Sequence, residues 1–240
     1  MTARELLRRI APRGAITLYR AIRDSRPIHP RTCPLCNYHG QFTHYGRPLR
    51  ADAMCPSCGS LERHRLFWLW FQQSGIQQPV LHFAPEPMLQ SRLRPRFPEY
   101  RTADPFMTGA DLKLNIEEID LPSACVKTII CAHVLEHVDD RKALLELYRI
   151  LAPGGVAVLS VPIVEGWDVT YEVPTITDPQ ARLMHYGQDD HVRFYGRDFR
   201  DRVKEAGFEL SEFTAEGPEV VEFGLMRGDK VFLGRKPPPG

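Results

Sequence analysis

From Pro79 to the end of the chain, short apolar runs alternate with helical patterns, and this alternation limits the fold more than any other feature. Such runs are typical of buried strands, and such patterns are typical of amphipathic helices. Alternation of the two over about 160 residues predicts a doubly wound α/β domain with a parallel sheet. The expected strands are residues 80–84, 100–103, 128–131 and 156–161, and the expected helices between them include 88–93 and 141–151.

Four of the six cysteines form two Cys-Pro-x-Cys pairs that are separated by eighteen residues. Each pair presents two thiolates from one tight turn, and two such turns close a tetrahedral site around Zn²⁺. We therefore predict a structural zinc module with the ligands Cys33, Cys36, Cys55 and Cys58. Two disulfides are the alternative. No signal peptide is evident, which predicts a reducing cytoplasmic location and disfavours disulfides.

The net charge of +1 conceals two opposed parts of the chain. Residues 1–65 contain 12 arginines and four acidic residues, a balance of +8, whereas residues 66–240 contain 19 basic and 26 acidic residues, a balance of −7. This asymmetry predicts two modules, the first of which suits an anionic partner such as RNA. The composition fits an ordinary globular protein, and no apolar run reaches the ~20 residues of a membrane span.

We expect three regions along the chain. Residues 1–30 place apolar side chains among arginines at helical spacing, which predicts amphipathic basic helices. Their basic face is either solvated or in contact with nucleic acid or a membrane. Residues 31–75 hold the zinc-ribbon module and a following helix at 61–73. A glycine and a proline then mark a boundary, and residues 79–240 form the α/β domain.

Two segments of the α/β domain match one pattern in order. His133-Val134-Leu135-Glu136-His137-Val138 follows an expected strand, and Leu151-Ala152-Pro153-Gly154-Gly155 ends the next helix. In this order they resemble the class I S-adenosylmethionine (SAM)-dependent methyltransferases, from residue 79 nearly to the C-terminus. With the cysteine pairs and the segments 60–65, 171–179 and 185–196, the chain looks like a member of a bacterial group of methyltransferases with an N-terminal four-cysteine zinc ribbon.

The resemblance implies a Rossmann-like, seven-stranded sheet whose seventh strand is antiparallel and forms a hairpin from residues 209–214 and 230–235. It also implies an enzyme with SAM as cofactor and a structural Zn²⁺. The loop after the first strand departs from the family's glycine-rich pattern, because it reads Ala-Pro-Glu-Pro. Ala84 and Glu86 are therefore expected to admit and hold the methionine part of SAM. A collapsed loop that binds no cofactor is the alternative.

Further cofactor contacts follow from the resemblance, one position at a time. After the second strand, the carboxylate of Asp104 is expected to accept hydrogen bonds from both ribose hydroxyls, or else only to form a turn. The adenine is expected near Asn115 and Ile116, and the methionine side near Cys131, Ala132 and His133. Glu136 and His137 follow on the same segment, and locking the next helix is their alternative role.

Residues 162–196 form a long connection after the fifth strand, where open α/β sheets bind their ligands. A stretch of this length with little periodicity is usually a lid or a binding loop. We predict that His191 is a general base with Asp190 or Asp189 as its partner. The alternative is that the polar groups pair with one another and fasten the segment. The expected set is catalytic His191, Asp190 and His133, with substrate-binding Tyr186, Arg193 and Tyr195.

Three functions from different classes fit these patterns. The leading one is a SAM-dependent methyltransferase that acts on an oxygen or nitrogen of a small-molecule acceptor. The second is an RNA base methyltransferase of the ribosomal-RNA type, in which the basic, zinc-bearing third of the chain binds RNA. The third is a non-catalytic scaffold with a degenerate methyltransferase fold, suggested by the missing glycines after the first strand.

Overall fold

The structure is a computed structural model, and it describes residues 14–15, 18–19, 29–46 and 48–238. The basic helices predicted for residues 1–30 therefore fall for the most part outside the described residues. The chain forms two compact units. The first contains residues 1–68 and 215–227, and the second contains residues 69–214 and 228–240. No helix in the described part of the chain is both long and apolar enough to cross a membrane.

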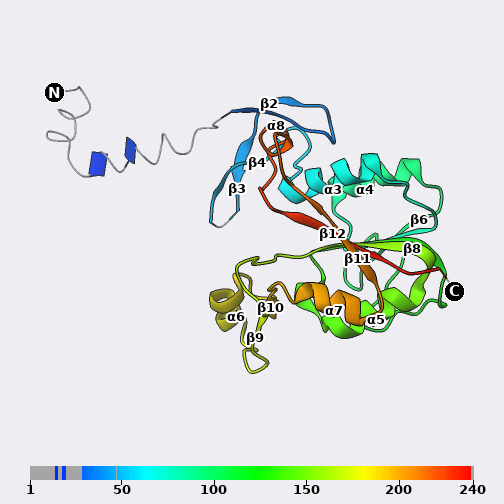
Figure 1. The fold of residues 1–240 in the computed structure, drawn as a ribbon. Coiled ribbons are helices and arrows are strands. Elements are labelled where there is room, and N and C mark those ends of the chain that lie inside the picture. The colour runs from blue at the N-terminus through cyan, green and yellow to red at the C-terminus, as the bar shows by residue number, and fades with distance from the viewer. Residues whose placement is uncertain (1–13, 16–17, 20–28, 47, 239–240) are drawn as a thin grey trace. The chain divides into compact units, whose positions relative to one another are not determined.

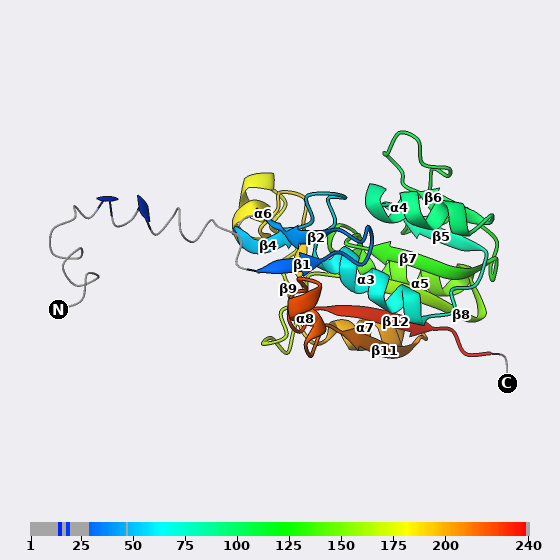
Figure 2. The same ribbon diagram turned by 90° about the horizontal axis from the view of Figure 1, so that it is seen from above.

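The second unit is built on a sheet with the strand order β11-β12-β8-β7-β5-β6. Neighbouring strands from β8 to β6 run parallel, whereas β12 is antiparallel to both β8 and β11. The parallel sheet, its antiparallel strand and the final hairpin confirm the predicted architecture, and Figure 2 shows the strands from above. The strands are β5 (Val80–Phe83), β6 (Tyr100–Ala103), β7 (Val126–Ala132), β8 (Leu151–Ser160), β11 (Glu209–Thr214) and β12 (Lys230–Arg235).

The sheet has six strands within the described residues, where we predicted seven. At the edge beside β6 the chain folds back and forms only an isolated bridge between Ala103 and Leu112. The carboxylate of Asp111 accepts the Thr102 N–H at 2.8 Å, and the Leu112 N–H donates to the Thr102 carbonyl at 3.0 Å. These bonds satisfy the backbone of the edge strand. A short return segment therefore lies beside β6, where one more edge strand would complete the predicted seven.

Helices cover both faces of this sheet. Figure 1 shows α5 (Asp140–Ile150) and α7 (Phe199–Glu205) on one face and α4 (Pro87–Leu93) on the other. The helix α5 begins where Asp139 accepts the N–H of Lys142, and it buries Ala143, Leu144, Leu147 and Ile150 along one stripe. This stripe packs in the main hydrophobic core with β7 and β8. A 3₁₀ turn, η1 (Arg94–Arg96), follows α4 directly.

The Pro-Gly-Gly segment, which was expected to end the helix, lies inside the first half of β8 and needs its glycines for a steric reason. A Cβ on Gly155 would lie 2.7 Å from the carbonyl oxygen of Lys127 on the neighbouring strand and 2.8 Å from that of Ala152. Gly154 adopts φ +75°, which side chains rarely tolerate. The segment therefore lets β8 approach β7 closely enough to pair.

Residues 162–196, the connecting segment, carry short elements that the sequence pattern does not reveal. These are β9 (Tyr171–Glu172), α6 (Pro179–Tyr186) and β10 (Arg193–Phe194), and β10 pairs antiparallel with β9. The helix α6 begins where Asp178 accepts the Ala181 N–H, and it ends at Gly187 in the left-handed conformation. In Figure 1 the three elements lie together beside one end of the sheet.

The first unit contains two antiparallel hairpins, β1 (Pro30–Thr32) with β2 (His39–Gln41) and β3 (Thr43–Tyr45) with β4 (Arg50–Met54). The helix α3 (Glu62–Gln73) follows them within one residue of the predicted start, and the boundary between the units falls inside this helix. A segment from far along the chain, residues 215–227 with α8 (Glu219–Glu222), completes the unit.

Arg65 is the residue that joins these distant segments. Its side chain is fully buried, and its guanidinium donates to the carbonyls of Ser60 at 2.6 Å and Ala53 at 2.9 Å. It also donates to the carbonyls of Phe223 at 2.7 Å and Gly224 at 2.6 Å. Burial lowers the pKa of Arg65, although nearby acidic groups oppose the shift. The four bonds tie residues 223–224 to the hairpin module.

Candidate active site and cysteine cluster

The predicted cofactor residues gather at the carboxyl ends of the parallel strands. Phe83, the last residue of β5, is in register with Ala103 of β6 and Cys131 of β7. The next residues along the chain are Ala84, Asp104 and Ala132, the last of which ends β7, and they therefore lie at the same edge of the sheet. The strand order reverses between β5 and β7, and such a switch point is where open α/β sheets bind ligands.

Two non-glycine residues at this edge adopt the left-handed backbone conformation. Ala84 has φ 44° after β5, and His133 has φ 54° after β7. This conformation costs about 1–3 kcal/mol for a residue with a side chain, and such strain concentrates at functional sites. Ala84 thus gives the loop a backbone shape that glycine normally provides. Its N–H donates to the Ala103 carbonyl at 2.9 Å, so this loop is anchored to the edge.

Asp104 begins the return segment after β6 and is partly exposed. Its Oδ1 accepts the N–H groups of Phe106 at 2.7 Å and Met107 at 2.6 Å. One carboxylate oxygen therefore shapes the turn, as the alternative interpretation expects. Asn115 is exposed, and its Oδ1 accepts the Glu117 N–H at 3.0 Å.

Three of the predicted contacts lie differently from the expectation. Ile116 is 5% exposed and Cys131 is 0% exposed, and both belong to the hydrophobic core of the unit. Burial raises the pKa of the Cys131 thiol. Glu86 points back to β5, where its Oε2 lies 3.3 Å from Nε2 of the buried His82. We therefore leave Ile116 and Cys131 out of the proposed cofactor contacts.

His82 is a site residue that the sequence analysis missed. It is fully buried on β5, and its Nδ1 lies 2.7 Å from the hydroxyl of Tyr100 on β6. Together with Glu86 it forms a buried polar chain beneath the loop after β5. A histidine in the middle of the apolar run Val-Leu-His-Phe is the signal that could have found it.

A cluster of histidines and acids follows β7. In it, Nδ1 of His133 lies 3.0 Å from Oε1 of the fully buried Glu136, and Nδ1 of His137 lies 3.2 Å from Oδ2 of Asp190. The rings of His137 and His191 make an edge contact with centroids 4.6 Å apart. The turn η2 (Leu135–His137) brings Glu136 and His137 to this position, and His191 comes from the connecting segment. We call these five residues the histidine cluster.

Burial and charge set the protonation of the cluster. Burial raises the pKa of the Glu136 carboxyl, but the hydrogen bond and charge of His133 outweigh it, and the pKa lies below its usual range. Burial lowers the pKa of His191, although the charge of Glu136 opposes the shift. Glu136 is therefore an anion at neutral pH, and His191 is a neutral imidazole.

The pairing predicted between Asp190 and His191 is replaced by another one. Asp190 is largely exposed and lies against His137, because η2 presents that ring toward the connecting segment. His191 is 4% exposed and packs beneath it. The carboxylate that approaches the histidines from inside the fold is Glu136, which sequence reasoning treated as a helix lock.

Arg193 fastens the connecting segment to η2. Its guanidinium donates to the carbonyls of Leu135 at 2.7 Å and Val138 at 2.6 Å, and to Oε1 of Glu172 at 2.6 Å. The side chain is 4% exposed, so it has no free face for an acidic substrate group. This arrangement agrees with the alternative in which the polar groups fasten the segment.

The two predicted tyrosines are buried in the same way. The hydroxyl of Tyr195 donates to the Leu135 carbonyl at 2.9 Å and to Asp140 at 3.0 Å. The hydroxyl of Tyr186 accepts the Val173 N–H at 3.0 Å and closes the connecting segment on itself. Neither side chain is more than 1% exposed. We therefore assign Arg193, Tyr186 and Tyr195 to positioning rather than to substrate binding.

A cavity of about 440 Å³ adjoins the histidine cluster. His137 lines it from the cluster side, and Glu172 and Arg193 line it from the connecting segment. Cavities that bind small molecules have volumes of about 300–1,000 Å³. The space beside the cluster is therefore of the size that a small acceptor needs.

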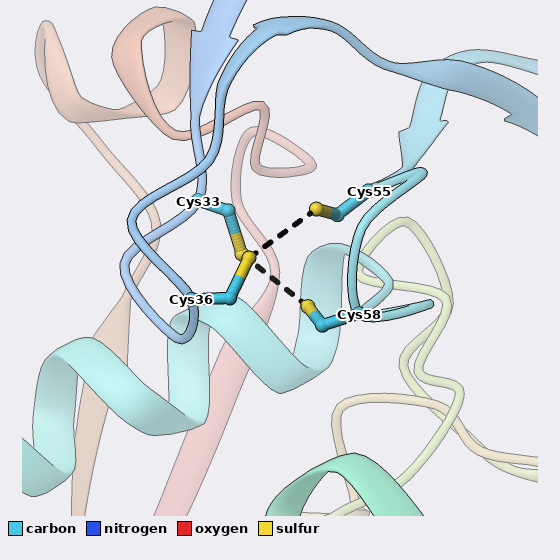
Figure 3. A group of neighbouring side chains, drawn as sticks. All are labelled: Cys33, Cys36, Cys55 and Cys58. Atoms are coloured by element: carbon cyan, nitrogen blue, oxygen red, sulfur yellow. Dashed lines mark hydrogen bonds between the residues drawn. The ribbon is translucent and has the colours of Figure 1, made fainter.

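The four cysteines of the first unit come together at one point, with the two pairs facing each other in Figure 3. The Sγ atoms of Cys33 and Cys58 are 3.6 Å apart, and those of Cys36 and Cys55 are 3.7 Å apart. Four sulfurs at about 2.3 Å from a tetrahedral ion lie about 3.8 Å apart, which fits Zn²⁺. A disulfide needs a sulfur separation of about 2.05 Å. The geometry therefore fits a metal site and excludes the predicted alternative.

The two cysteine turns repeat one hydrogen-bond pattern. In the first, the N–H of Asn37 donates to the Cys33 carbonyl at 2.8 Å, and in the second the N–H of Gly59 donates to the Cys55 carbonyl at 2.9 Å. Asn37 and Gly59 both adopt positive φ, which lets each turn close. Although burial opposes it, hydrogen bonds from Tyr38 and Ser57 lower the pKa of the Cys36 thiol to about 7.

The strand order and the ligand edge at its switch point define the class I methyltransferase architecture. The family described as Methyltransferase domain matches residues 67–212, which is more than half of the chain. The chain therefore belongs to this family of SAM-dependent methyltransferases. No curated protein matches the chain.

Solved structures of methyltransferases are distantly similar. A SAM-dependent methyltransferase from Thermotoga maritima has 16% identity and a TM-score of 0.47, over 68% of this chain and 84% of that one. One from Archaeoglobus fulgidus has 14% identity and a TM-score of 0.48, over 72% and 92%. The 1,6-didemethyltoxoflavin-N1-methyltransferase of Burkholderia thailandensis has 15% identity and a TM-score of 0.43, over 66% and 71%. These similarities are too distant to carry an argument about the acceptor.

Proposed function

We propose that this methyltransferase transfers the methyl group of SAM to an oxygen or nitrogen of a small-molecule acceptor. The observation that carries the proposal is the cavity of about 440 Å³ beside the histidine cluster. Its walls come partly from the connecting segment, which Arg193 fastens to η2. A pocket of this volume suits a metabolite better than an extended strand of RNA.

SAM is proposed to lie along the carboxyl edge of β5, β6 and β7. There Ala84 leaves room for the methionine part, and Glu86 provides a negative charge near its ammonium group. Asp104 is proposed to accept the ribose hydroxyls with Oδ2, since Oδ1 is engaged in the turn. The adenine is proposed near Asn115, and the methyl-bearing end near Ala132 and His133. Bound SAM supplies an electrophilic methyl group on a positively charged sulfur.

The histidine cluster is proposed to prepare the acceptor. Methyl transfer would form a bond from the acceptor's lone pair to the methyl carbon while the bond from that carbon to the sulfur of SAM breaks and its electron pair stays on the sulfur. The proton of the acceptor must also leave. His133 is 30% exposed and follows β7 directly, where the acceptor is expected to meet the methyl group. Glu136 orients its ring through the 3.0 Å contact between Oε1 and Nδ1. We propose His133 as the group that receives this proton, with His191 and Asp190 supporting the cluster.

The four-cysteine cluster is proposed to bind structural Zn²⁺. Its sulfur separations fit the ion, and the turns use all four cysteines, so no coordination position is left for chemistry. Among the described arginines of the module, Arg31 pairs with Asp52 and Arg50 pairs with Glu62. Arg65 is buried on carbonyls. Part of the basic charge is therefore used within the module itself.

The acceptor class is tested with labelled SAM and two sets of acceptors, a metabolite extract and total RNA. We expect label to enter low-molecular-weight products, because the proposed site has the volume of a small molecule. RNA binding measured at rising salt is the companion experiment, since phosphate contacts predict a steep fall of affinity. Label in RNA together with such a salt dependence would replace this proposal with an RNA methyltransferase.

The proposed ribose contact is tested by substituting Asp104. Asp104→Ala is expected to weaken SAM binding at least about tenfold, the effect of losing a hydrogen bond to a charged group. Asp104→Asn keeps an oxygen for the turn but presents an amide to the ribose, and we expect a similar loss. Calorimetry with SAM measures both. If only the alanine variant loses affinity, Asp104 serves the turn, and if the wild type binds no SAM, the chain is a scaffold.

A further inference from the structure

Three side chains of the histidine cluster lie close together and have no direct part in the proposed proton transfer. Glu136, His137 and His191 each direct one potential ligand atom to a common region, and these atoms lie within 4.8 Å of one another. Two ligand atoms that each lie about 2.1 Å from a tetrahedral ion are about 3.4 Å apart. A contraction of up to about 1.4 Å would therefore place all three on a single ion.

Two buried atoms of this group have no hydrogen-bond partner among the residues that the structure describes. Oε2 of Glu136 and Nδ1 of His191 are both inaccessible to solvent, and their side chains are 0% and 4% exposed. An unpartnered buried polar atom costs about 1–3 kcal/mol, and more when the group is charged. The fold thus holds a carboxylate oxygen and an imidazole nitrogen away from water without satisfying either.

Contacts between histidine nitrogens and carboxylate oxygens orient the other atoms of these side chains, as is common around metal ions in proteins. Oε1 of Glu136 lies 3.0 Å from Nδ1 of His133, and Nδ1 of His137 lies 3.2 Å from Oδ2 of Asp190. Metal-binding histidines commonly donate their second ring nitrogen to a carboxylate, which orients the first nitrogen toward the ion. Asp190 plays this part for His137. The same pattern fixes Glu136 through His133.

We propose that Glu136, His137 and His191 bind a divalent transition-metal ion, distinct from the ion of the four cysteines. Two imidazoles and one carboxylate suit Zn²⁺, Fe²⁺ or Co²⁺, and three protein ligands leave coordination positions open. On the proposed function, from which this part of the inference follows, an oxygen of the acceptor takes an open position. The acceptor is then a compound with a hydroxyl or similar oxygen donor.

The test uses the full chain purified with one zinc per chain in its four-cysteine site. Co²⁺ is the probe, because it binds nitrogen and sulfur sites less tightly than Zn²⁺ and leaves that zinc in place. Calorimetry and metal analysis after desalting are expected to show one Co²⁺ per chain. Glu136→Gln and His191→Gln are expected to lower the Co²⁺ affinity at least about 100-fold. His185→Ala, an exposed histidine of the same segment, is the matched control with unchanged affinity.

Two results would overturn the proposal. One is a wild-type protein that binds no Co²⁺, and the other is binding that both glutamine variants retain. Calorimetry with SAM on the same samples reports whether each variant is folded, and His137→Asn serves if a glutamine variant is not. A protein that binds SAM without Co²⁺ refutes this inference alone. A protein that binds Co²⁺ but transfers no methyl group refutes the proposed function alone.

Discussion

Removal of the Zn²⁺ that we propose for the four-cysteine cluster is expected to unfold the first unit. Its described elements are hairpins of three to five residues per strand and two helices, too little to bury a self-sufficient core. Structural zinc contributes about 10–16 kcal/mol in small domains of this kind. Chelation, or the substitution Cys55→Ser, should therefore remove most of the stability of the unit.

Hydrogen exchange resolved by mass spectrometry is the measurement that localises this effect. We expect faster exchange in residues 30–60 and, at the same time, in residues 215–227. The two segments should open together because Arg65 binds the carbonyls of both Ala53 and Gly224. The sheet from β5 to β8 should keep its protection. Cys125→Ser, a cysteine outside the cluster, is the control that should bind zinc normally. A metal-free protein that keeps residues 30–60 protected would contradict the metal assignment.

Arg193→Met is expected to lower the free energy of unfolding of the second unit by about 3–5 kcal/mol, the cost of breaking a buried ion pair. The substitution leaves Glu172 without its 2.6 Å partner and frees the carbonyls of Leu135 and Val138. Those carbonyls belong to the turn that presents Glu136 and His137. We therefore expect methyl transfer to fall more than SAM binding, since the proposed SAM contacts Ala84, Glu86 and Asp104 follow β5 and β6, whereas this turn follows β7.

Denaturant unfolding followed by circular dichroism checks this stability change. Arg197→Met is the matched control, because Arg197 pairs with Asp168 on the surface, where such pairs contribute about 0–1 kcal/mol. Arg193→Lys keeps the charge but cannot reach all the acceptors, so its loss should lie between the two. Equal stabilities for the Arg193→Met and Arg197→Met variants would show that the buried network does not hold the connecting segment.

Local patterns were sufficient for most of the secondary structure. The apolar runs gave β5, β6 and β7 to within two residues, and the helical stripe gave α5, whereas β8 begins five residues before its predicted start. The cysteine spacing identified the four residues that meet in the first unit. These features depend on side chains close together in the chain, where alternation and turn chemistry act directly. The six-stranded sheet departs from the expected seven because the Asp111 segment satisfies the edge of β6 without forming a strand.

The candidate site was only partly predictable. The edge with Ala84, Asp104 and His133 followed from the strand pattern, since parallel strands end together. The partners of charged groups did not follow, because they come from distant parts of the chain. Asp190 stands beside His191 in sequence but pairs with His137, and Glu136 proved to be the buried acid of the cluster. Adjacency along an irregular segment does not fix which side chains face each other.

The sequence by itself determined a strand–helix alternation, two Cys-Pro-x-Cys turns and a split of charge between the ends of the chain. Only the tertiary structure decided that residues 215–227 complete the cysteine-bearing unit and that Arg193 fastens the connecting segment. Arg65 and Phe223 are separated by 158 residues, and no local preference encodes their hydrogen bond. Such contacts form only in the folded chain. The buried guanidinium of Arg65 requires carbonyl partners, and residues 223–224 of the connection between β11 and β12 provide two of them.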